Sequence, residues 1–232
     1  MDEWGIHAES CTAGGDKTSG HHAVRNDLYV QSKRGATAPV LEASGVLNVL
    51  GISAADRGVG PVGDQATAER PADVLLCRAH DIVTGAGGMG NGRVALDVGI
   101  VCPQAASHLG DAAGESLGAA EAYVRAKCER HLIERRCREA GVVFQPMIFE
   151  SLGGVSAEAE RVIKCLNKRV AANTESPEGE VATQFWHRVS IDIQRSGHRA
   201  FARRVSRGVD EGGFSLAGDL GVTQLLAMPG DL

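Results

Sequence analysis

The sequence predicts an α/β fold of the three-layer type, in which helices cover a small mixed sheet. The first observation is a pair of short apolar segments with strand character, at residues 72–77 and 93–101. The second is an amphipathic helical pattern over 115–140 that is followed by a third strand-like segment, 142–150. The third is the alternation of strands and helices along the chain, which favours an α/β class over separate all-α or all-β layers.

The first predicted element is a helix over residues 21–33, which Gly35 ends. A short extended piece, 39–41, follows it, with Glu42 directly after. Residues 51–69 are rich in Gly, Ala and Asp and show no periodicity, so we expect an irregular loop there.

The strand over 93–101 has the clearest pattern in the chain. One face, by strict alternation, carries Val94, Leu96, Val98 and Ile100. Asp97 and Gly99 share the opposite face. The strand over 72–77 reads ADVLLC, so that Asp73 lies at its start.

The helix predicted over 115–140 ends at Gly141, where a C-terminal cap is expected. Its apolar stripe consists of Leu117, Ala120, Val124, Cys128 and Leu132. The next strand, 142–150, contains Pro146, which indicates a sheet edge or a bulge.

Two further helices complete the fold. The first covers 156–173 and turns inward Ala159, Ile163, Leu166 and Val170. The second covers 179–206 with an interruption near Gly197, and the acidic, Gly-rich tail from Gly208 is expected to be loose.

Composition describes an ordinary globular domain with two unusual values. The 232 residues include 43% hydrophobic and 23% charged residues, enough to bury a sizeable core. Glycine occurs 30 times and aromatics make up only 4%, which predicts many loops and a core of Val, Leu, Ile and Ala. No segment has the length of a membrane span, the acidic N-terminus is not a targeting peptide, and six scattered cysteines indicate reduced thiols inside a cell.

The net charge of −5 hides a strong asymmetry. Residues 1–160 hold 14 Lys/Arg against 21 Asp/Glu, residues 161–207 hold 10 against 4, and residues 208–232 hold none against 4. A further basic run lies within 125–138. Such basic helices are typical of a polyanion-binding face, and equally of a solvated helix surface.

Asp73 and Asp97 are the most informative pair of residues. Each carboxylate lies in or beside an apolar strand, where an ionised group is costly to bury without a partner. Two such acids on adjacent strands suggest a shared cation, and Mg²⁺ suits one or two carboxylates with a phosphate substrate. The alternative is that each acid caps a strand end or pairs with Arg70 or Arg93.

Other motifs point away from familiar chemistries. The string GAGGMG at 85–90 is followed by a strand and not by the helix that a dinucleotide site needs, so a glycine-rich hairpin is favoured over an oxidoreductase. Zinc is suggested by His7 and Cys11 with His21 and His22, but only the first two form an acceptable pair. The chain lacks a nucleophile elbow, an H-E-x-x-H helix and a Walker loop.

The order of motifs resembles a known module. D-x-x-G-x-H-A-x-x-C comes first, then a His-centred helix start, RPADVLL, VALDVGIV and a basic helix. This order is similar to the restriction-endonuclease-like PD-(D/E)XK domain attached to the C-terminus of non-LTR retrotransposon reverse transcriptases. The resemblance covers roughly residues 2–205 and implies a three-layer α/β/α fold with a small mixed sheet and extra C-terminal helices. Its most specific parts are RPADV and ALDV.

The resemblance assigns roles to individual residues. Asp73 matches the aspartate of the PD motif and Asp97 the second acid, which together would hold Mg²⁺ or Mn²⁺. The resemblance matches Glu42 to an outlying catalytic glutamate of the family. The motif lysine is replaced by Gly99, and Lys127 on the following helix is the candidate to supply its ammonium, or else an ordinary surface lysine.

Two further positions match without an assigned role. His21 matches the histidine of the family's R-H-N, while its neighbours have drifted. Glu150 resembles a glutamate of the reverse-transcriptase-linked group.

The N-terminus resembles the end of a zinc knuckle. His7 and Cys11 match its last two ligands, so that Zn²⁺ is expected only if upstream ligands exist before Met1. We therefore expect a truncated or divergent copy of a larger element product. The expected parts are a knuckle-like remnant (1–20), an endonuclease-like core (21–155), basic C-terminal helices (156–207) and a flexible acidic tail (208–232).

The function that the resemblance implies is a metal-dependent DNA endonuclease that nicks target DNA for a retroelement. Its alternative is a catalytically inactive, nucleic-acid-binding remnant, which Gly99 and the drifted His motif favour. Phosphate contacts are expected from Arg125, Arg130, Lys164, Lys168, Arg169 and Arg195. Expected partners are DNA, with element RNA or the polymerase portion of the same polyprotein as further ones and no membrane. The expected location is intracellular, and nuclear if the domain is functional.

Overall fold

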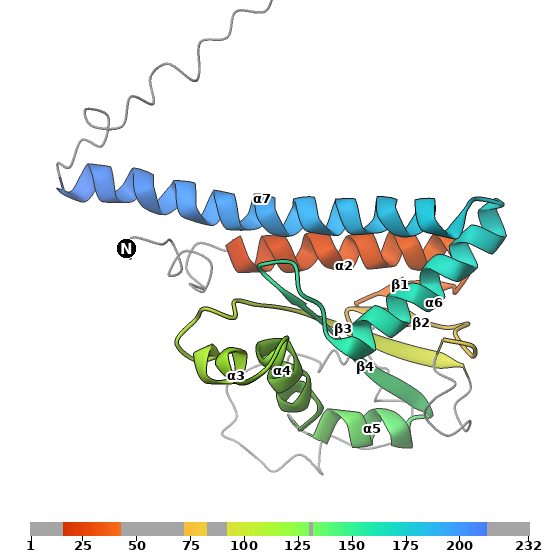
Figure 1. The fold of residues 1–232 in the computed structure, drawn as a ribbon. Helices are drawn as coiled ribbons and strands as arrows, with labels where there is room; N and C mark the ends of the chain where they lie inside the picture. The colour runs from red at the N-terminus through yellow and green to blue at the C-terminus, as the bar shows by residue number, and fades with distance from the viewer. Residues whose placement is uncertain (1–15, 43–71, 83–91, 130–131, 213–232) are drawn as a thin grey trace, which may run out of the picture.

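The fold comes from a computed structural model that describes residues 16–42, 72–82, 92–129 and 132–212. Six helices and four strands occur in this part of the chain. In chain order they are α2 (Asp16–Arg34), β1 (Pro39–Leu41), β2 (Val74–Leu76), β3 (Arg93–Val101), α3 (Leu109–Gly114), α4 (Gly118–Glu129), α5 (Ile133–Glu139), β4 (Val142–Glu150), α6 (Ala157–Thr174) and α7 (Glu178–Gly212). The predicted mixed α/β class is confirmed (Figure 1).

The strands form one mixed sheet in the order β1-β2-β3-β4. β1 pairs with β2 and β2 with β3 in antiparallel fashion, whereas β3 and β4 are parallel along their whole nine-residue lengths. Among the described strands β4 lies at an edge, which explains how Pro146 is tolerated in it. The strands over 93–101 and 142–150 have the predicted bounds, and β2 is shorter than predicted.

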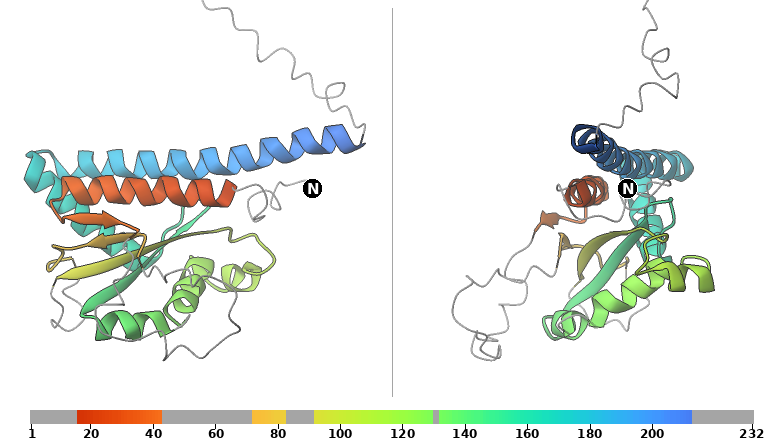
Figure 2. Two further views of the ribbon diagram at one scale, coloured as in Figure 1. Left: turned by 180° about the vertical axis from the view of Figure 1, so that it is seen from behind. Right: turned by 90° about the vertical axis from the view of Figure 1, so that its left-hand side faces the viewer.

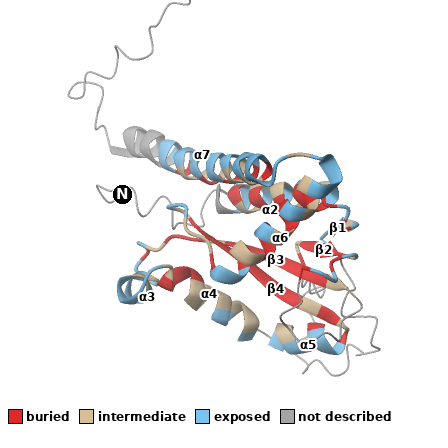
Figure 3. Ribbon diagram, turned by 45° about the vertical axis from the view of Figure 1, so that its right-hand side comes forward, coloured by how far each residue is buried: buried red, intermediate tan, exposed pale blue. Residues whose placement is uncertain are grey.

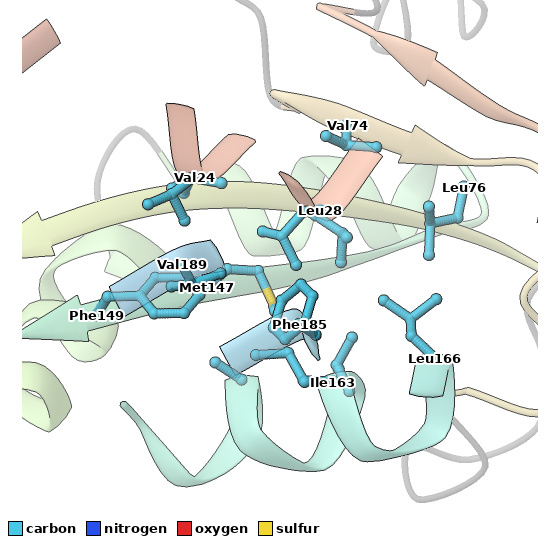
Figure 4. Packing of buried hydrophobic residues seen from close by; sticks show 14 of the residues in the cluster. Val24, Leu28, Val74, Leu76, Met147, Phe149, Ile163, Leu166, Phe185 and Val189 are labelled. Carbon is cyan, nitrogen blue, oxygen red and sulfur yellow. The ribbon is translucent and has the colours of Figure 1, made fainter. Parts of the chain in front are cut away.

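One face of the sheet is covered by α2, α6 and α7. The predicted inward side chains of β3 pack there with helix residues in a large buried cluster that contains Val24, Leu28, Val94, Leu96, Val98, Met147, Phe149, Ile163, Leu166 and Phe185 (Figure 4). All four predicted inward residues of 156–173 are fully buried. Because residues of α2, α6 and α7 share this cluster, the C-terminal helices are part of the main core and not an appendage.

The opposite face is covered by α4 and α5. Ala95 packs there against Cys137 of α5, and Val101 packs against Ala119 and Ala120 of α4. Figure 2 shows these two helices on the side of the sheet away from α2 and α7. β3 and β4 are consequently buried between helices along most of their length (Figure 3).

The prediction of one helix over 115–140 is wrong. The segment contains α4 and α5, and Leu132 between them adopts a left-handed backbone with φ of 54°. Leu132 is also exposed, although the apolar stripe places it inward. The break lets α5 turn toward β4 and the Cys137 cluster, while Gly141 ends α5 with the expected positive φ of 65°.

The prediction of an interruption near Gly197 is also wrong, because α7 is continuous from Glu178 to Gly212 and includes the first residues of the expected loose tail. A glycine inside a helix costs about 1 kcal/mol relative to alanine and does not have to end it. Here the small residues have a packing role: a Cβ on Gly20 of α2 would lie 2.5 Å from Ser196 Oγ. The two helices can therefore approach closely.

Some predictions fall outside the described residues. These are the loop at 51–69, the string at 85–90 and the N-terminal segment with His7 and Cys11. Of the described helices, none has the length and apolar character needed to cross a membrane.

Candidate active site

The two acids predicted to share a site lie on neighbouring strands. The antiparallel register pairs Val74 with Leu96, and the backbone N–H of Asp73 donates to the Leu96 carbonyl at 2.9 Å. The Asp73 carboxylate then accepts a 2.7 Å hydrogen bond from the backbone N–H of Val98, directly after Asp97. The strand pairing thus fixes the Asp73 side chain against the segment that carries Asp97.

Lys127 reaches this pair from α4. Its Nζ lies 2.7 Å from Asp97 Oδ1 and donates a 3.0 Å hydrogen bond to the carbonyl of Val98. The Lys127 side chain is only 15% exposed, so it is held between helix and sheet and is not the solvated surface lysine of the alternative interpretation. Asp97 is paired with this lysine rather than with Arg93, whose guanidinium donates to the Ala140 carbonyl.

Gly99 makes room for the lysine. A Cβ at this position would lie 2.8 Å from both Ile148 Cδ1 and Tyr123 Cε1, and 3.3 Å from Lys127 Cε. Real Cβ atoms essentially never come within 3.0 Å of such neighbours. The space that Gly99 leaves is therefore bordered by Ile148, Tyr123 and the Lys127 side chain, which pack together as one arrangement. Tyr123 completes it, because the Lys127 ammonium lies 5.7 Å from its ring centroid.

His21 joins the site from α2. Its Nε2 lies 3.0 Å from Asp73 Oδ2, the same oxygen that Val98 N–H contacts. Sequence reasoning matched His21 to a family motif but gave it no role, because nothing in the sequence places it next to a residue 52 positions away. The one feature of the sequence that could have indicated this contact is the position of His21 at the start of the predicted helix, before the strand that carries Asp73.

The surroundings shift the pKa values of the two acids in opposite directions. Burial raises the pKa of Asp97, and the charge of Asp73 adds to this effect against the opposing contact with Lys127. Burial also acts on Asp73, but the contacts with His21 and the N–H of Val98 outweigh it and lower the pKa of that carboxyl. The site thus holds two carboxyl groups with different proton affinities.

Glu42 lies next to Asp73 through the backbone. Its N–H donates to the Asp73 carbonyl at 2.9 Å, one step beyond the end of β1. Its side chain forms an ion pair with Arg25 of α2. The structure therefore brings Glu42 to the site's border, with its carboxylate held by Arg25.

Glu150 supports the helix that carries Lys127. Its Oε1 accepts a 3.2 Å hydrogen bond from the backbone N–H of Ala120, in the first turn of α4. This turn has N–H groups without partners inside the helix, so a buried carboxylate there acts as a cap from a distant strand. Glu121 of α4 does the same for α6, accepting 2.9 Å from Ala157 N–H.

The residues present fit a hard divalent cation better than zinc. Asp73 and Asp97 offer carboxylate oxygens of the type that Mg²⁺ and Mn²⁺ use, and the hydrogen bonds of Asp73 engage one of its two oxygens. Within the described ranges, no group of three or more His, Cys, Asp or Glu side chains is arranged to hold a metal ion. A site of this kind would thus depend on ligands from the substrate, as Mg²⁺ sites on phosphates do.

The predicted phosphate-binding residues have different surroundings. Arg125 of α4 and Lys168 of α6 are exposed. Lys164 lies 2.7 Å from Glu160 on its own helix. Arg169 donates to the Gly35 carbonyl at 3.0 Å and pairs with Asp81, so it ties α6 to the end of α2.

The remaining predicted positions divide in the same way. Arg195 is exposed on α7 and lies 3.9 Å from Asp192. Arg130, His7 and Cys11 lie outside the described residues.

Comparisons with protein-family models, with curated proteins and with solved structures gave no match to this chain. The contacts described above define the candidate active site. It consists of Asp73, Asp97, Lys127 and His21, with Glu42 at its border.

Proposed function

We propose that this chain is a metal-dependent DNA endonuclease domain with a three-layer, restriction-endonuclease-like fold. The proposal includes the role that the motifs imply, nicking of target DNA for a retroelement, in the nucleus. It is supported by a mixed sheet with α2, α6 and α7 on one face and α4 and α5 on the other. The two acids lie on adjacent strands of that sheet.

The observation that carries the proposal is the triad of Asp97, Lys127 and Gly99. Phosphodiester hydrolysis needs a positive group near the developing charge on the phosphate, and the motif supplies it from the strand position that Gly99 occupies. Here the Lys127 ammonium of α4 lies 2.7 Å from Asp97 Oδ1, next to the position of Gly99, and in this proposal it replaces the lysine of the motif.

Each residue has a separate task in the proposed reaction. Asp73 and Asp97 would hold the cation, which when bound activates water and offsets charge on the leaving oxygen. Lys127 has three N–H donors, of which two go to Asp97 and the Val98 carbonyl, and the third can contact a phosphate oxygen. His21 fixes the orientation of the Asp73 carboxylate by contacting one of its oxygens.

A catalytically inactive, DNA-binding remnant is the second candidate. The observation that favours it is the occupation of both acids by protein partners, His21 and Val98 for Asp73 and Lys127 for Asp97. In this case the site residues only stabilise the fold, and the basic helices still bind DNA. Element RNA and the polymerase portion of the same polyprotein are further proposed partners in either case.

A nicking assay distinguishes the two candidates. Supercoiled plasmid is incubated with the full chain and Mg²⁺ or Mn²⁺, alongside the Asp97→Asn and Asp73→Asn variants. The endonuclease proposal predicts open-circular product that EDTA abolishes and that both variants reduce by at least about a hundredfold. DNA binding that weakens steeply with salt, without nicking under either metal, selects the inactive remnant.

A further inference from the structure

We infer that Tyr123 of α4 is a positioning residue, whose ring holds the Lys127 ammonium beside Asp97. This inference rests on the proposed function, because it concerns the group that would contact the phosphate in that reaction. Tyr123 would act on the reaction only through Lys127 and would not contact the DNA itself.

The two side chains are neighbours on one face of α4. Tyr123 and Lys127 are four residues apart in the helix, so one lies above the other. Lys127 Nζ is 5.7 Å from the centroid of the Tyr123 ring, within the range of a cation–π contact. The Lys127 side chain is 15% exposed and Tyr123 is half-buried, and such contacts become stronger as water is excluded.

The ring of Tyr123 is itself held by neighbours outside α4. A Cβ on Gly99 of β3 would lie 2.8 Å from Tyr123 Cε1 and equally close to Ile148 Cδ1 of β4, so the ring edge lies against the sheet. The ring also forms an edge-to-face contact with His108, directly before α3, at 6.2 Å between centroids and an interplanar angle of 85°. Because the ring is packed on two sides, it has little freedom to turn away from Lys127.

Lys127 needs such a support because a lysine side chain is long and flexible, and fixing its ammonium costs rotamer freedom. The other contacts of the ammonium are Asp97 Oδ1 at 2.7 Å and the Val98 carbonyl at 3.0 Å. Asp97 is also a candidate ligand of the cation, and a carboxylate that holds a cation attracts an ammonium less strongly. The Tyr123 ring has no such second task, so its hold on Lys127 is not weakened in this way.

An uncharged ring is better suited to this task than a second acid. A carboxylate would neutralise the ammonium, which must keep its charge to stabilise charge on a phosphate. An aromatic ring attracts the ammonium through its quadrupole and carries no net charge. Among the residues that the structure describes, Asp97 is the one acid that forms an ion pair with Lys127.

The inference is tested first by the accessibility of Lys127, which can be measured without nicking. The full chain is treated briefly with an amine-acetylating reagent, and the acetylation of each lysine is followed by mass spectrometry. Two ringless variants, Tyr123→Leu and Tyr123→Met, keep an apolar side chain, and either one suffices if the other does not fold. Tyr123→Phe keeps the ring.

The chain offers a matched control and an internal standard. Tyr29 is the other tyrosine of the chain, is half-buried as well, and packs in the large cluster on the opposite face of the sheet, so Tyr29→Leu is the control. Lys168, exposed on α6, is the standard for the reagent. Circular dichroism and Tm establish which variants fold as the wild type does.

We expect the ringless variants to raise the acetylation rate of Lys127 at least about threefold, which corresponds to a weak cation–π contact. Tyr123→Phe and Tyr29→Leu should leave this rate within about twofold of the wild type, because both keep the ring at position 123. The rate at Lys168 should be the same in all variants. Ringless variants in which Lys127 reacts at the wild-type rate, or a Tyr123→Phe variant that behaves as they do, would overturn the inference.

The nicking rate then tests whether Tyr123 acts through Lys127. We expect the ringless variants to lower kcat at least about tenfold, with KM for the plasmid within about twofold, because the ring contacts the ammonium and not the DNA. Tyr123→Phe should restore kcat to within about threefold of the wild type. In a Lys127→Met background, removal of the ring should change the rate by less than about twofold. A further tenfold loss in that background would overturn the inference, since the ring would then act independently of the lysine.

Failure of the inference and failure of the proposed function give different results. A chain that nicks DNA, but in which neither the reactivity of Lys127 nor kcat depends on the ring, refutes the inference alone. A chain in which removal of the ring releases Lys127, but which does not nick with Mg²⁺ or Mn²⁺, refutes the endonuclease and leaves the hold of Tyr123 on Lys127 standing.

Discussion

Replacing Gly99 by alanine tests whether the glycine and Lys127 form one arrangement. The added methyl group would lie 2.8 Å from Ile148 Cδ1 and Tyr123 Cε1, which belong to a buried sheet and a packed helix. Overpacking of this kind costs about 1–3 kcal/mol of the free energy of unfolding. Lys127 Cε, at 3.3 Å, must also move by a few tenths of an ångström. Since small misplacements of a reacting group can lower rates by about a hundredfold, we expect nicking to fall at least about tenfold.

The assay combines urea denaturation with the plasmid-nicking rate, and Gly179→Ala is its control. Gly179 lies in the first turn of α7 with nothing within 4 Å of the position of a Cβ. There alanine is expected to leave the free energy of unfolding unchanged or to raise it by up to about 1 kcal/mol. If Gly99→Ala is as stable as Gly179→Ala and nicks at the wild-type rate, the steric complementarity between Gly99 and Lys127 is refuted.

Three further predictions concern the fold. Burial and a second carboxylate, on α7, raise the pKa of Asp27 to about 6. Folding therefore takes up a proton, and the free energy of unfolding falls as pH rises from about 4 to 6. Asp27→Asn should raise the free energy of unfolding by about 1–3 kcal/mol at pH 7.5, measured by denaturation, and flatten its dependence on pH. Glu150→Ala leaves the N–H of Ala120 without its buried acceptor and should lower Tm, with a loss of about 1–2 kcal/mol that Glu150→Gln largely restores. Gln31 donates a 2.7 Å hydrogen bond to Asn167 Oδ1, so Asn167→Ala leaves the buried Gln31 amide without its acceptor. The free energy of unfolding in urea should fall by about 1–3 kcal/mol. A loss below about 0.5 kcal/mol would show that water replaces the missing partner.

The parts of the fold that the sequence predicts best are those with strong periodicity. Strict alternation over 93–101 predicts both the bounds of β3 and the face that Asp97 shares with Gly99. The apolar stripe of 156–173 similarly predicts four of the six buried residues of α6, and misses Val162 and Asn167. In both segments the pattern repeats often enough to fix period and phase.

Other features depend on contacts between distant segments. Nothing local in 115–140 requires the left-handed backbone at Leu132, which allows α5 to bury Cys137 against the sheet. Gly197 predicts a break, but α7 continues through it, and the neighbouring Ser196 packs closely against Gly20 of α2.

Within the site, the apolar strands predict the acid pair, and the family resemblance adds Lys127 from the helix that follows. The apolar stripe of the helix places Lys127 at the edge that faces the sheet. The contact of His21 with Asp73 and the cap that Glu150 provides for α4 depend on tertiary packing. A residue pattern along one segment carries no information about which distant backbone it will meet.

The most direct test of the central claim is the rate of plasmid nicking in Mg²⁺ by the wild type, Asp97→Asn, Lys127→Met and the double variant. If Asp97 and Lys127 act as one unit, each single variant loses at least about a hundredfold and the double variant loses no more than the worse of the two. All four proteins must share the wild-type fold by circular dichroism. A Lys127→Met variant that nicks at the wild-type rate, or losses that multiply in the double variant, would contradict a site in which the ammonium and the carboxylate work together.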